Sequence, residues 1–246
     1  MKTTDANASG NFAVSPYLAC ERREIYALLM LSAGMMGAYT FNLRGGVFCN
    51  AQTANVVMMA VAIGQGHWAH GLYYLIPMAA YCLGSMLSEM LPSPVKKLGF
   101  LRWDTCLVAF EALVLFLVGC IPLEAPHAIV QITINFIASM QYNTFRQMEG
   151  IPMATTFCTN HVRQVGVALA RIIRQKDQAA VRRGLAHLVM LLCFFGGGAV
   201  LTPFCSLWGE KAIWLALIPN GIVLCRLVYA DRVSEHDLLG RKPAGH

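Results

Sequence analysis

Charged side chains are scarce in this chain of 246 residues. Asp, Glu, Lys and Arg together make up 13% of the chain, whereas soluble domains carry roughly a quarter. Hydrophobic residues account for 57%, and the mean hydropathy is +0.52. This composition excludes an ordinary soluble domain and indicates an integral membrane protein.

Signals of several other protein classes are also missing. No Ser-His-Asp order, phosphate loop, Rossmann fingerprint or zinc-protease helix is present, so we expect no enzyme. The nine cysteines form no Cys-x-x-Cys pair, and His67-x-x-His70 offers only two ligands, so we expect neither a metal nor another cofactor. The first 23 residues lack the apolar segment of a secretory signal. The net charge of +6 comes from basic residues in the gaps between apolar runs, which argues against nucleic-acid binding.

Apolar runs recur along the chain and predict one membrane domain over residues 24–230. Polar cytoplasmic tails, 1–23 and 231–246, flank this domain. The predicted spans are 25–43, 71–91, 103–121, 127–145, 185–207 and 212–229. A further run, 47–64, has 18 residues and would be about 27 Å long as a helix, slightly short of a full crossing.

The stretch 34–57 has the pattern of a broken membrane helix. It joins two apolar runs through Arg44-Gly45-Gly46, and polar residues open the second run. These residues are Asn50, Gln52, Thr53 and Asn55. Thr and Asn side chains can cap the free N–H groups of a helix start, and an interruption in hydrocarbon is tolerated only where protein covers it or it borders a cavity. We therefore predict a polar centre within the membrane.

A second break follows at 145–158 and leads into an amphipathic helix over 155–178, whose last turn is strongly basic. The motifs around the second break follow the same order as those around the first break. Leu43-Arg44, a glycine break and Thr53-Ala54-Asn55-Val56 correspond to Phe145-Arg146, Gly150 and Thr159-Asn160-His161-Val162, and Tyr81-Cys82-Leu83-Gly84 corresponds to Cys193-Phe194-Phe195-Gly196. The sequence thus predicts two repeats, 24–122 and 126–230.

The basic residues distinguish two topologies for these repeats. If both segments after the breaks cross fully, the chain has eight spans in two parallel four-helix repeats, with 12 basic residues on the side of the termini and 6 opposite. If both are short or re-entrant, it has six spans in two inverted repeats, and 17 of 19 basic residues lie with the termini. The positive-inside rule favours the second arrangement, an all-α membrane protein with both termini cytoplasmic.

The chain resembles the YoaK family of small bacterial integral membrane proteins, which is classed by a domain of unknown function. The residues that carry the resemblance are GGVFCNAQTAN from Gly45 to Asn55 and MQYNTFRQMEGIPMATTFCTN from Met140 to Asn160. Gly37, Ala54 and Asn160-His161 depart from the family pattern, which has an Asp near position 37 and Thr-Gly-Asn in both motifs. The resemblance implies a bacterial cytoplasmic-membrane protein and supplies no substrate.

In the inverted arrangement the two short helices begin close together, where their N-terminal N–H groups would suit an anion or a small polar solute. The candidate substrate-binding residues are Asn50, Gln52, Thr53, Asn55, Gln141, Asn143, Thr156, Thr159 and Asn160. The alternative is that these side chains only cap helices and pack the two halves together.

Glu111 lies in the middle of an apolar span, where an unpaired carboxylate costs about 2.5 to 3.5 kcal/mol. The candidate partners of this buried charge are Arg44, Arg146 and Arg163. A protonated Glu111 that couples proton movement to transport is the other interpretation.

The sequence favours a small-solute transporter or channel in the lipid bilayer, with an unknown solute. The rival is a non-transporting structural or regulatory membrane protein that binds a partner, and a homo-oligomer is left open. A cavity bordered by both breaks would favour transport, and a dry packed centre would favour the rival.

Overall fold

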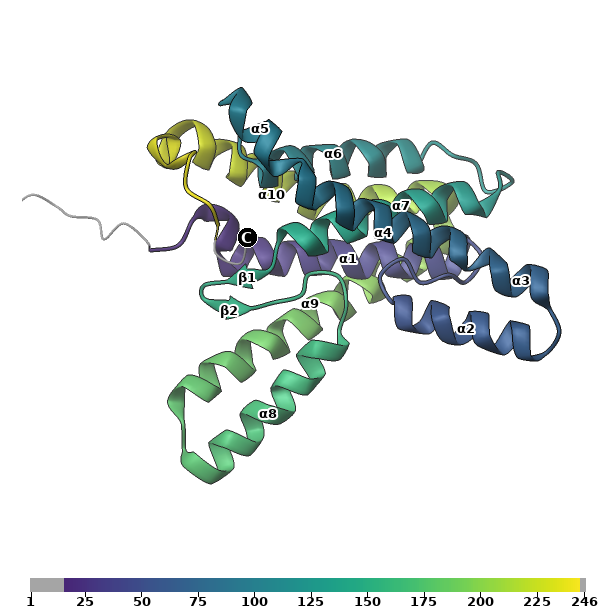
Figure 1. Ribbon diagram of the computed structural model, residues 1–246, viewed down its shortest axis with the longest axis horizontal. Helices are drawn as coiled ribbons and strands as arrows, with labels where there is room; N and C mark the ends of the chain where they lie inside the picture. Colours follow the sequence, from purple (N-terminus) through teal and green to yellow (C-terminus); the bar gives the residue numbers. More distant parts are fainter. Residues whose placement is uncertain (1–15, 244–246) are drawn as a thin grey trace, which may run out of the picture.

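The computed structural model describes residues 16–243, and almost all of its regular structure is helical (Figure 1). The α-helices are α1 (Arg23–Leu43), α2 (Gln52–Gly64), α3 (Trp68–Tyr73), α4 (Leu75–Met90), α5 (Pro92–Leu98), α6 (Trp103–Val118), α7 (His127–Thr144), α8 (Thr159–Gln175), α9 (Gln178–Trp208) and α10 (Leu217–Tyr229). Shorter turns are η1 (Ala19–Glu21), η2 (Gly209–Ala216), η3 (Ala230–Ser234) and η4 (His236–Leu238). An antiparallel hairpin, β1 (Gln147–Met148) and β2 (Ile151–Pro152), lies between α7 and α8. The predicted all-α class is confirmed.

Some predicted boundaries were wrong. The run 47–64 is helical only from Gln52, because residues 47–51 are irregular. The span predicted to start at 185 begins seven residues earlier, at Gln178, where Asp177 accepts a hydrogen bond from the backbone N–H of Ala179 and caps α9. The predicted span 71–91 lies within the apolar helical stretch Trp68–Val95, in which a turn at Tyr74 separates α3 from α4. Residues 212–216 of the last span belong to η2.

The two halves of the chain run in opposite directions. Figure 1 shows α1 starting at the end of the molecule where the chain ends lie, and α7 running back toward that end. The short helices behave alike. Each starts near the middle of the molecule, and α2 leads away from the chain ends while α8 leads toward them (Figure 1). With 13 residues, α2 is about 20 Å long.

The two halves also exchange helix partners. α1 of the first half packs against α9 of the second, and α7 of the second half packs against α4 of the first. Each short helix packs on the helix that follows it, α2 on α3 and α8 on α9. The first helix of each half thus lies against a later helix of the other half, which interlocks the predicted repeats.

Glycines permit these close crossings. A Cβ at Gly34 would lie 2.0 Å from the carbonyl oxygen of Phe194, and a Cβ at Gly197 would lie 2.0 Å from that of Leu31, so α1 and α9 touch backbone to backbone. Gly84 of α4 meets α7 in the same way, because a Cβ at Gly84 would lie 2.4 Å from the carbonyl oxygen of Phe136. Small residues at helix crossings are typical of membrane helix packing.

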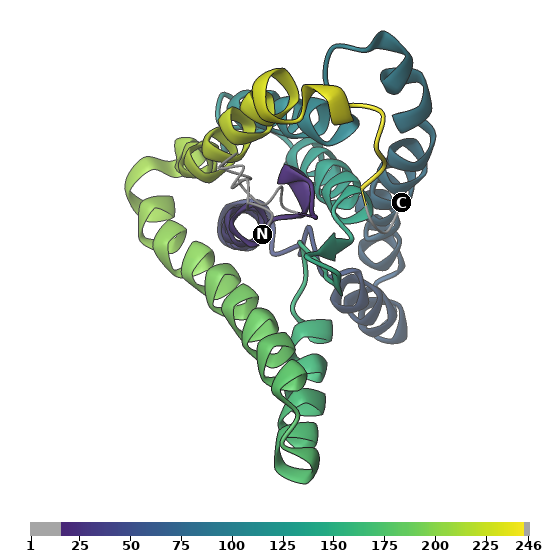
Figure 2. The same cartoon turned by 90° about the vertical axis from the view of Figure 1, so that its left-hand side faces the viewer.

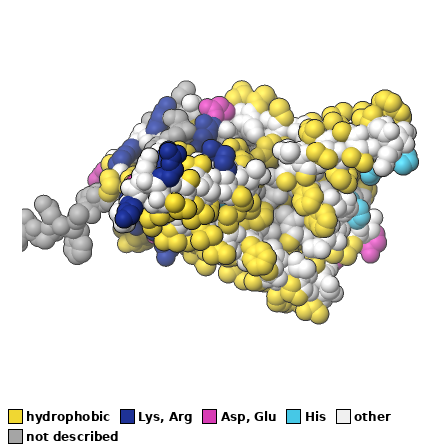
Figure 3. Space-filling view, turned by 90° about the horizontal axis from the view of Figure 1, so that it is seen from below, with side chains coloured by type: hydrophobic (Ala, Val, Ile, Leu, Met, Phe, Trp, Pro, Cys, Tyr) yellow, Lys and Arg dark blue, Asp and Glu magenta, His cyan; other side chains and the backbone are white. Residues whose placement is uncertain are grey.

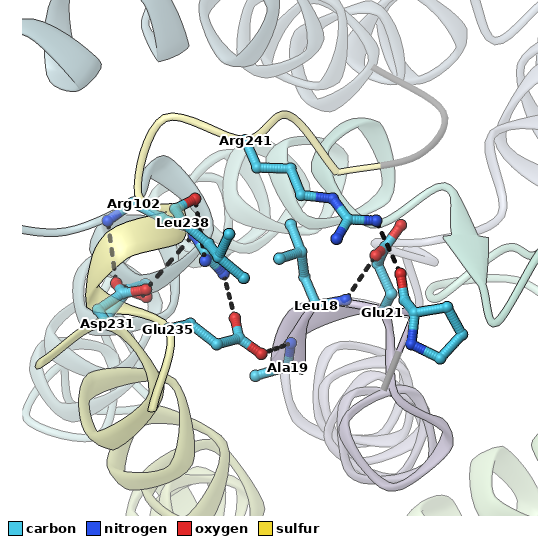
Figure 4. A network of polar contacts seen from close by, with 10 residues as sticks. Leu18, Ala19, Glu21, Arg102, Asp231, Glu235, Leu238 and Arg241 are labelled. Atoms are coloured by element: carbon cyan, nitrogen blue, oxygen red, sulfur yellow. Dashed lines mark hydrogen bonds and ion pairs between the residues drawn. The ribbon is translucent and has the colours of Figure 1, made fainter. Parts of the chain in front are cut away.

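The two chain ends are tied together at one end of the helical body (Figure 4). Arg102 is 5% exposed and forms ion pairs with Glu235, at 2.7 Å, and with Asp231, at 3.7 Å. The carboxylate of Glu235 also accepts a hydrogen bond from the backbone N–H of Ala19 at 2.8 Å. We call Ala19, Arg102, Asp231 and Glu235 the terminal clasp.

Burial alone would lower the pKa of Arg102, but the hydrogen bond to Glu235 and the surrounding carboxylates raise the pKa above its ordinary value. The guanidinium is therefore charged. Parts of the predicted tails belong to the folded body, since Leu18 is buried in an apolar cluster against which Leu238 also packs. Residues 1–15 and 244–246 of those tails lie outside the described residues.

Large apolar side chains cover much of the outside of the helices (Figure 3). Two continuous helical stretches, Trp68–Val95 and Gln178–Ser234, are long and apolar enough to cross a membrane, and α2 is a shorter apolar helix. Lys and Arg side chains gather at the end of the molecule where the chain ends lie (Figure 3). α8 and the start of α9 form an arm that projects from the other helices (Figure 2).

Candidate functional site

A pocket of about 1320 Å³ lies between α1, α9 and the starts of α2 and α8. We call it the central pocket. Its polar lining residues are Asn42, Asn50, Gln52, Thr53, Tyr81, Thr159, Asn160, Arg163 and Thr202. Aromatic and leucine side chains form much of the rest, namely Phe41, Phe48, Phe157, Leu191, Leu192, Phe194 and Phe195. Both breaks therefore border one cavity.

The first break turns the chain back into the body. Gly45 and Gly46 have φ of 81° and 71°, a left-handed conformation that glycine adopts without strain. The side chain of Gln131 on α7 donates a hydrogen bond to the carbonyl oxygen of Arg44 at 2.5 Å and fixes the start of the turn. Beyond it, Cys49 is fully buried, so the irregular segment is covered by protein, as an interruption in hydrocarbon requires.

Asn55 and Gln52 hold this returning segment in place. Asn55 donates to the carbonyl oxygen of Phe48, seven residues back, at 2.8 Å. Gln52 donates to Oδ1 of Asn135 on α7, also at 2.8 Å. These bonds fix the start of α2 against the first helix of the other half.

The second break uses the hairpin to make its turn. Glu149 and Gly150 at its tip have φ of 45° and 78°, the pair of positive φ values that a tight two-residue hairpin needs. The chain then returns through buried residues to α8, and Gln141 of α7 donates to the carbonyl oxygen of Thr155 at 3.2 Å. His161 contacts the carbonyl oxygen of Ala154, seven residues back, at 2.9 Å.

His161 thus does in the second half what Asn55 does in the first. The two residues are counterparts in the repeat alignment, and each holds the carbonyl group seven positions earlier. A carbonyl oxygen only accepts hydrogen bonds, so Nε2 of His161 carries the proton.

Five of the nine predicted binding residues line the central pocket. They are Asn50, Gln52, Thr53, Thr159 and Asn160, and Arg163 lines it as well. Asn55, Gln141 and Thr156 are fully buried in the breaks and are not among the lining residues. Asn143 lies elsewhere, because its amide contacts Ser88 on α4 at 2.8 Å.

The expected helix caps were wrong. The N-cap positions of α2 and α8 are Ala51 and Cys158, and neither helix start has a side-chain cap hydrogen bond. The Thr and Asn side chains instead face the pocket or hold the returning loops. No side chain of the described residues therefore caps the first N–H groups of either short helix.

Several buried polar atoms in the breaks have no hydrogen-bond partner among the described residues. They are Oδ1 of Asn55, Oε1 of Gln141 and the hydroxyls of Thr155 and Thr156. Buried polar groups without partners each cost about 1 to 3 kcal/mol, and proteins normally satisfy them with protein groups or ordered water. Ordered water in the breaks would satisfy these atoms.

Glu111 does not pair with any of the predicted arginines. Within residues 16–243 both of its oxygens lack hydrogen-bond partners, although the side chain is fully buried. Arg44 instead donates to the carbonyl oxygens of Ile121 and Pro122 and to the hydroxyl of Tyr39. Arg146 forms an ion pair with Glu89. The expected pairing was wrong because Arg44 binds carbonyl groups that follow α6 and Arg146 binds Glu89 on α4.

Asn220 on α10 is a second buried polar side chain without a partner within residues 16–243, and it was missed. Like the carboxyl of Glu111, its amide is fully buried and has no hydrogen-bond partner among the described residues. The two apolar clusters of the body include residues before and after each of these positions, such as Val108 and Val114 on α6. Along its own helix, each of these two polar side chains therefore lies between residues of the two clusters.

A buried histidine pair joins α8 to α9. Nδ1 of His187 lies 3.0 Å from Nδ1 of His161, and both rings are fully buried. The sequence gives no signal for this pair, because the two residues are 26 positions apart in separate helices. Since His161 is protonated at Nε2, its Nδ1 accepts the proton of His187 Nδ1.

The lining of the central pocket carries positive charge and no negative charge. Arg163 is its single charged lining residue, and no Asp or Glu lies among the lining residues. Among the described residues Arg163 has no carboxylate within 4.0 Å, and its guanidinium donates to Asn160 at 3.0 Å. With two uncapped helix starts nearby, the polar side of the pocket favours negative charge.

Comparison with known proteins gives a family match over most of the chain. Residues 25–225 match the family described as protein of unknown function (DUF1275). Comparisons with curated proteins and with solved structures gave no match. Since the match covers more than half of the chain and includes both breaks, this protein belongs to the DUF1275 family.

Proposed function

We propose that this protein is a multi-pass membrane protein that moves a small solute through the central pocket. The observation that carries the proposal is the pocket itself, which is bordered by residues of both breaks, Asn50 and Thr53 from the first and Thr159 and Asn160 from the second. A cavity at the meeting point of two interrupted helices is a recurrent plan of transporters and channels.

The proposed membrane arrangement has six spans, formed by α1, α3 with α4, α6, α7, α9, and η2 with α10. In this arrangement α2 and α8 do not cross the membrane, and the chain enters and leaves on the same side at each of them. The opposite directions of α1 and α7, and the start of each short helix near the middle of the molecule, support two inverted repeats (Figure 1). The exposed apolar side chains of the helices support contact with lipid.

The proposed location is the bacterial cytoplasmic membrane, with both termini cytoplasmic. The gathering of Lys and Arg at the end of the molecule where the chain ends lie supports this orientation (Figure 3). The likeness of the break motifs to the YoaK family supports the bacterial assignment.

Solute flux in proteoliposomes tests the function. Stopped-flow light scattering compares empty and protein-containing liposomes over a panel of small anions and neutral solutes. Thr53→Val and Thr159→Val remove pocket hydroxyls with little change of volume, and Thr133→Val, on the exposed side of α7, is the matched control. We expect faster flux of at least one solute, reduced by both pocket variants and unchanged in the control.

Equal rates in empty and protein-containing liposomes for every solute would contradict transport. The rival, a non-transporting membrane protein that binds a partner, would then be favoured. The projecting arm of α8 and α9, with the exposed basic side chain of Arg182, is the surface that such a partner would meet (Figure 2).

A further inference from the structure

The walls of the central pocket are unlike those of a site for a small polar solute. Seven of its lining residues are phenylalanine or leucine, from both breaks and from α1 and α9. Its volume of about 1320 Å³ exceeds the roughly 300 to 1,000 Å³ typical of ligand pockets. A small hydrated ion would leave most of this apolar surface without a partner.

The pocket opens through an apolar rim. Phe41, Leu192 and Phe195 belong to its lining and are 50%, 59% and 72% exposed. Side chains this apolar at the mouth would face hydrocarbon in a membrane, because the same helices carry the lipid-facing surface. A ligand that enters here comes from the bilayer and is itself largely apolar.

The polar groups of the central pocket favour a ligand with an anionic head. Arg163 is a cation without a carboxylate partner among the described residues. Asn50 is 6% exposed, lines the pocket and donates through its amide nitrogen to the carbonyl oxygen of Ala33. The amide nitrogen carries a second N–H, for which the described residues supply no hydrogen-bond acceptor and which can donate to an anionic head.

We infer that the central pocket binds an amphipathic anion, with a carboxylate, sulfonate or phosphate head near Arg163 and an apolar body against the aromatic walls. The ligand enters sideways from the bilayer. This inference rests on the proposed function, since it names the class of solute that the same pocket takes. A membrane lipid headgroup and a free amphiphile share this chemistry.

Three matched probes distinguish the contribution of the anionic head of the ligand from that of its apolar body. Decanesulfonate has both parts, methanesulfonate has only the head, and decanol has only the apolar chain. The readout is the unfolding temperature of the full chain in neutral phosphatidylcholine nanodiscs, because a ligand that binds the folded state raises it. We expect decanesulfonate to raise the unfolding temperature clearly more than decanol, and methanesulfonate to have no effect at the same concentration.

Arg163→Gln tests the role of the cation, and Arg171→Gln is its matched control two turns further along α8, outside the central pocket. We expect the advantage of decanesulfonate over decanol to disappear in Arg163→Gln and to persist in Arg171→Gln. Equal effects of decanesulfonate and decanol on the wild type, or an unchanged advantage in Arg163→Gln, would overturn the inference. A methanesulfonate effect as large as that of decanesulfonate would also overturn it, by pointing to a polar solute.

Nanodiscs with phosphatidylglycerol distinguish the two sources of the ligand. If a lipid headgroup fills the pocket, the anionic lipid raises the unfolding temperature by itself and suppresses the effect of decanesulfonate. If a free amphiphile is the ligand, the decanesulfonate effect is the same in both nanodiscs. Decanesulfonate binding without any flux in proteoliposomes would contradict only the transport function, and flux of a small polar solute without decanesulfonate binding would contradict only this inference.

Discussion

The side chain of Gln52 donates a hydrogen bond to Oδ1 of Asn135 at 2.8 Å, which ties the first residue of α2 to α7. This bond joins the break of the first half to the opening helix of the second half. It therefore fixes one wall of the central pocket relative to the other half of the molecule.

Gln52→Leu should destabilise the protein by about 1 to 3 kcal/mol, because Asn135 is fully buried and its oxygen would lose its hydrogen-bond donor. Equilibrium unfolding in detergent measures the change. In a double-mutant cycle with Asn135→Leu, the double variant should lose less stability than the sum of the two single variants. Strict additivity would mean that the two side chains do not interact.

Gly197→Ala should strongly lower the stability of the assembled helices. Its Cβ would lie 2.0 Å from the carbonyl oxygen of Leu31, so α1 and α9 would have to separate. Gly196→Ala is the control on the same helix, because its Cβ would meet no atom closer than 4.0 Å. We expect the control to be neutral or more stable by up to about 1 kcal/mol through helix propensity, and equal effects of the two substitutions would contradict the close crossing.

His161→Asn should be milder than His161→Ala. Ala leaves the buried carbonyl group of Ala154 without its donor, at a cost of about 1 to 3 kcal/mol. Asn supplies the kind of donor that Asn55 uses at the same seven-residue spacing. Unfolding measurements on both variants test the equivalence of the two breaks, and an Asn variant as unstable as the Ala variant would count against it.

Arg102→Met should cost about 3 to 5 kcal/mol, because it leaves the buried carboxylates of Asp231 and Glu235 without their cation. Arg226→Met removes the exposed ion pair with Glu24 and should cost no more than about 1 kcal/mol. Chemical unfolding of the two variants gives the comparison. Similar losses for both would show that the terminal clasp contributes no more than a surface ion pair.

The sequence predicted the helices and the two breaks well, because helix periodicity and glycine breaks are local signals. Gly45-Gly46 marked the first turn, and the shared order of Thr53 and Thr159 marked the repeat. Five of the nine predicted binding residues line one pocket for the same reason, since polar side chains at helix starts follow the turn.

The other features of the fold and of the site depend on which helices pack together, and the local sequence pattern does not reveal this. The apolar walls of the central pocket come from α1 and α9, whose contact through Gly34 and Gly197 joins residues far apart in sequence. The contact between His161 and His187 and the pairing of Arg102 with Glu235 are equally non-local. The predicted partners of Glu111 were wrong because hydropathy gives the depth of a residue and not the face of the helix on which it lies.

The most direct test of the account is whether the two short helices begin at one site. Thr53→Cys and Thr159→Cys, placed together after replacement of the native cysteines, are treated in native membranes with a flexible bis-maleimide. A protease site is inserted at the exposed Glu124, between the two halves. After cleavage in denaturant, a cross-linked chain stays full length, whereas a chain without the cross-link separates into two fragments. The account predicts retention for this pair and cleavage into two fragments for Thr53→Cys with Ile173→Cys, whose isoleucine is exposed on α8 about 21 Å beyond Thr159. Cleavage of both pairs, with each single cysteine reactive, would contradict it.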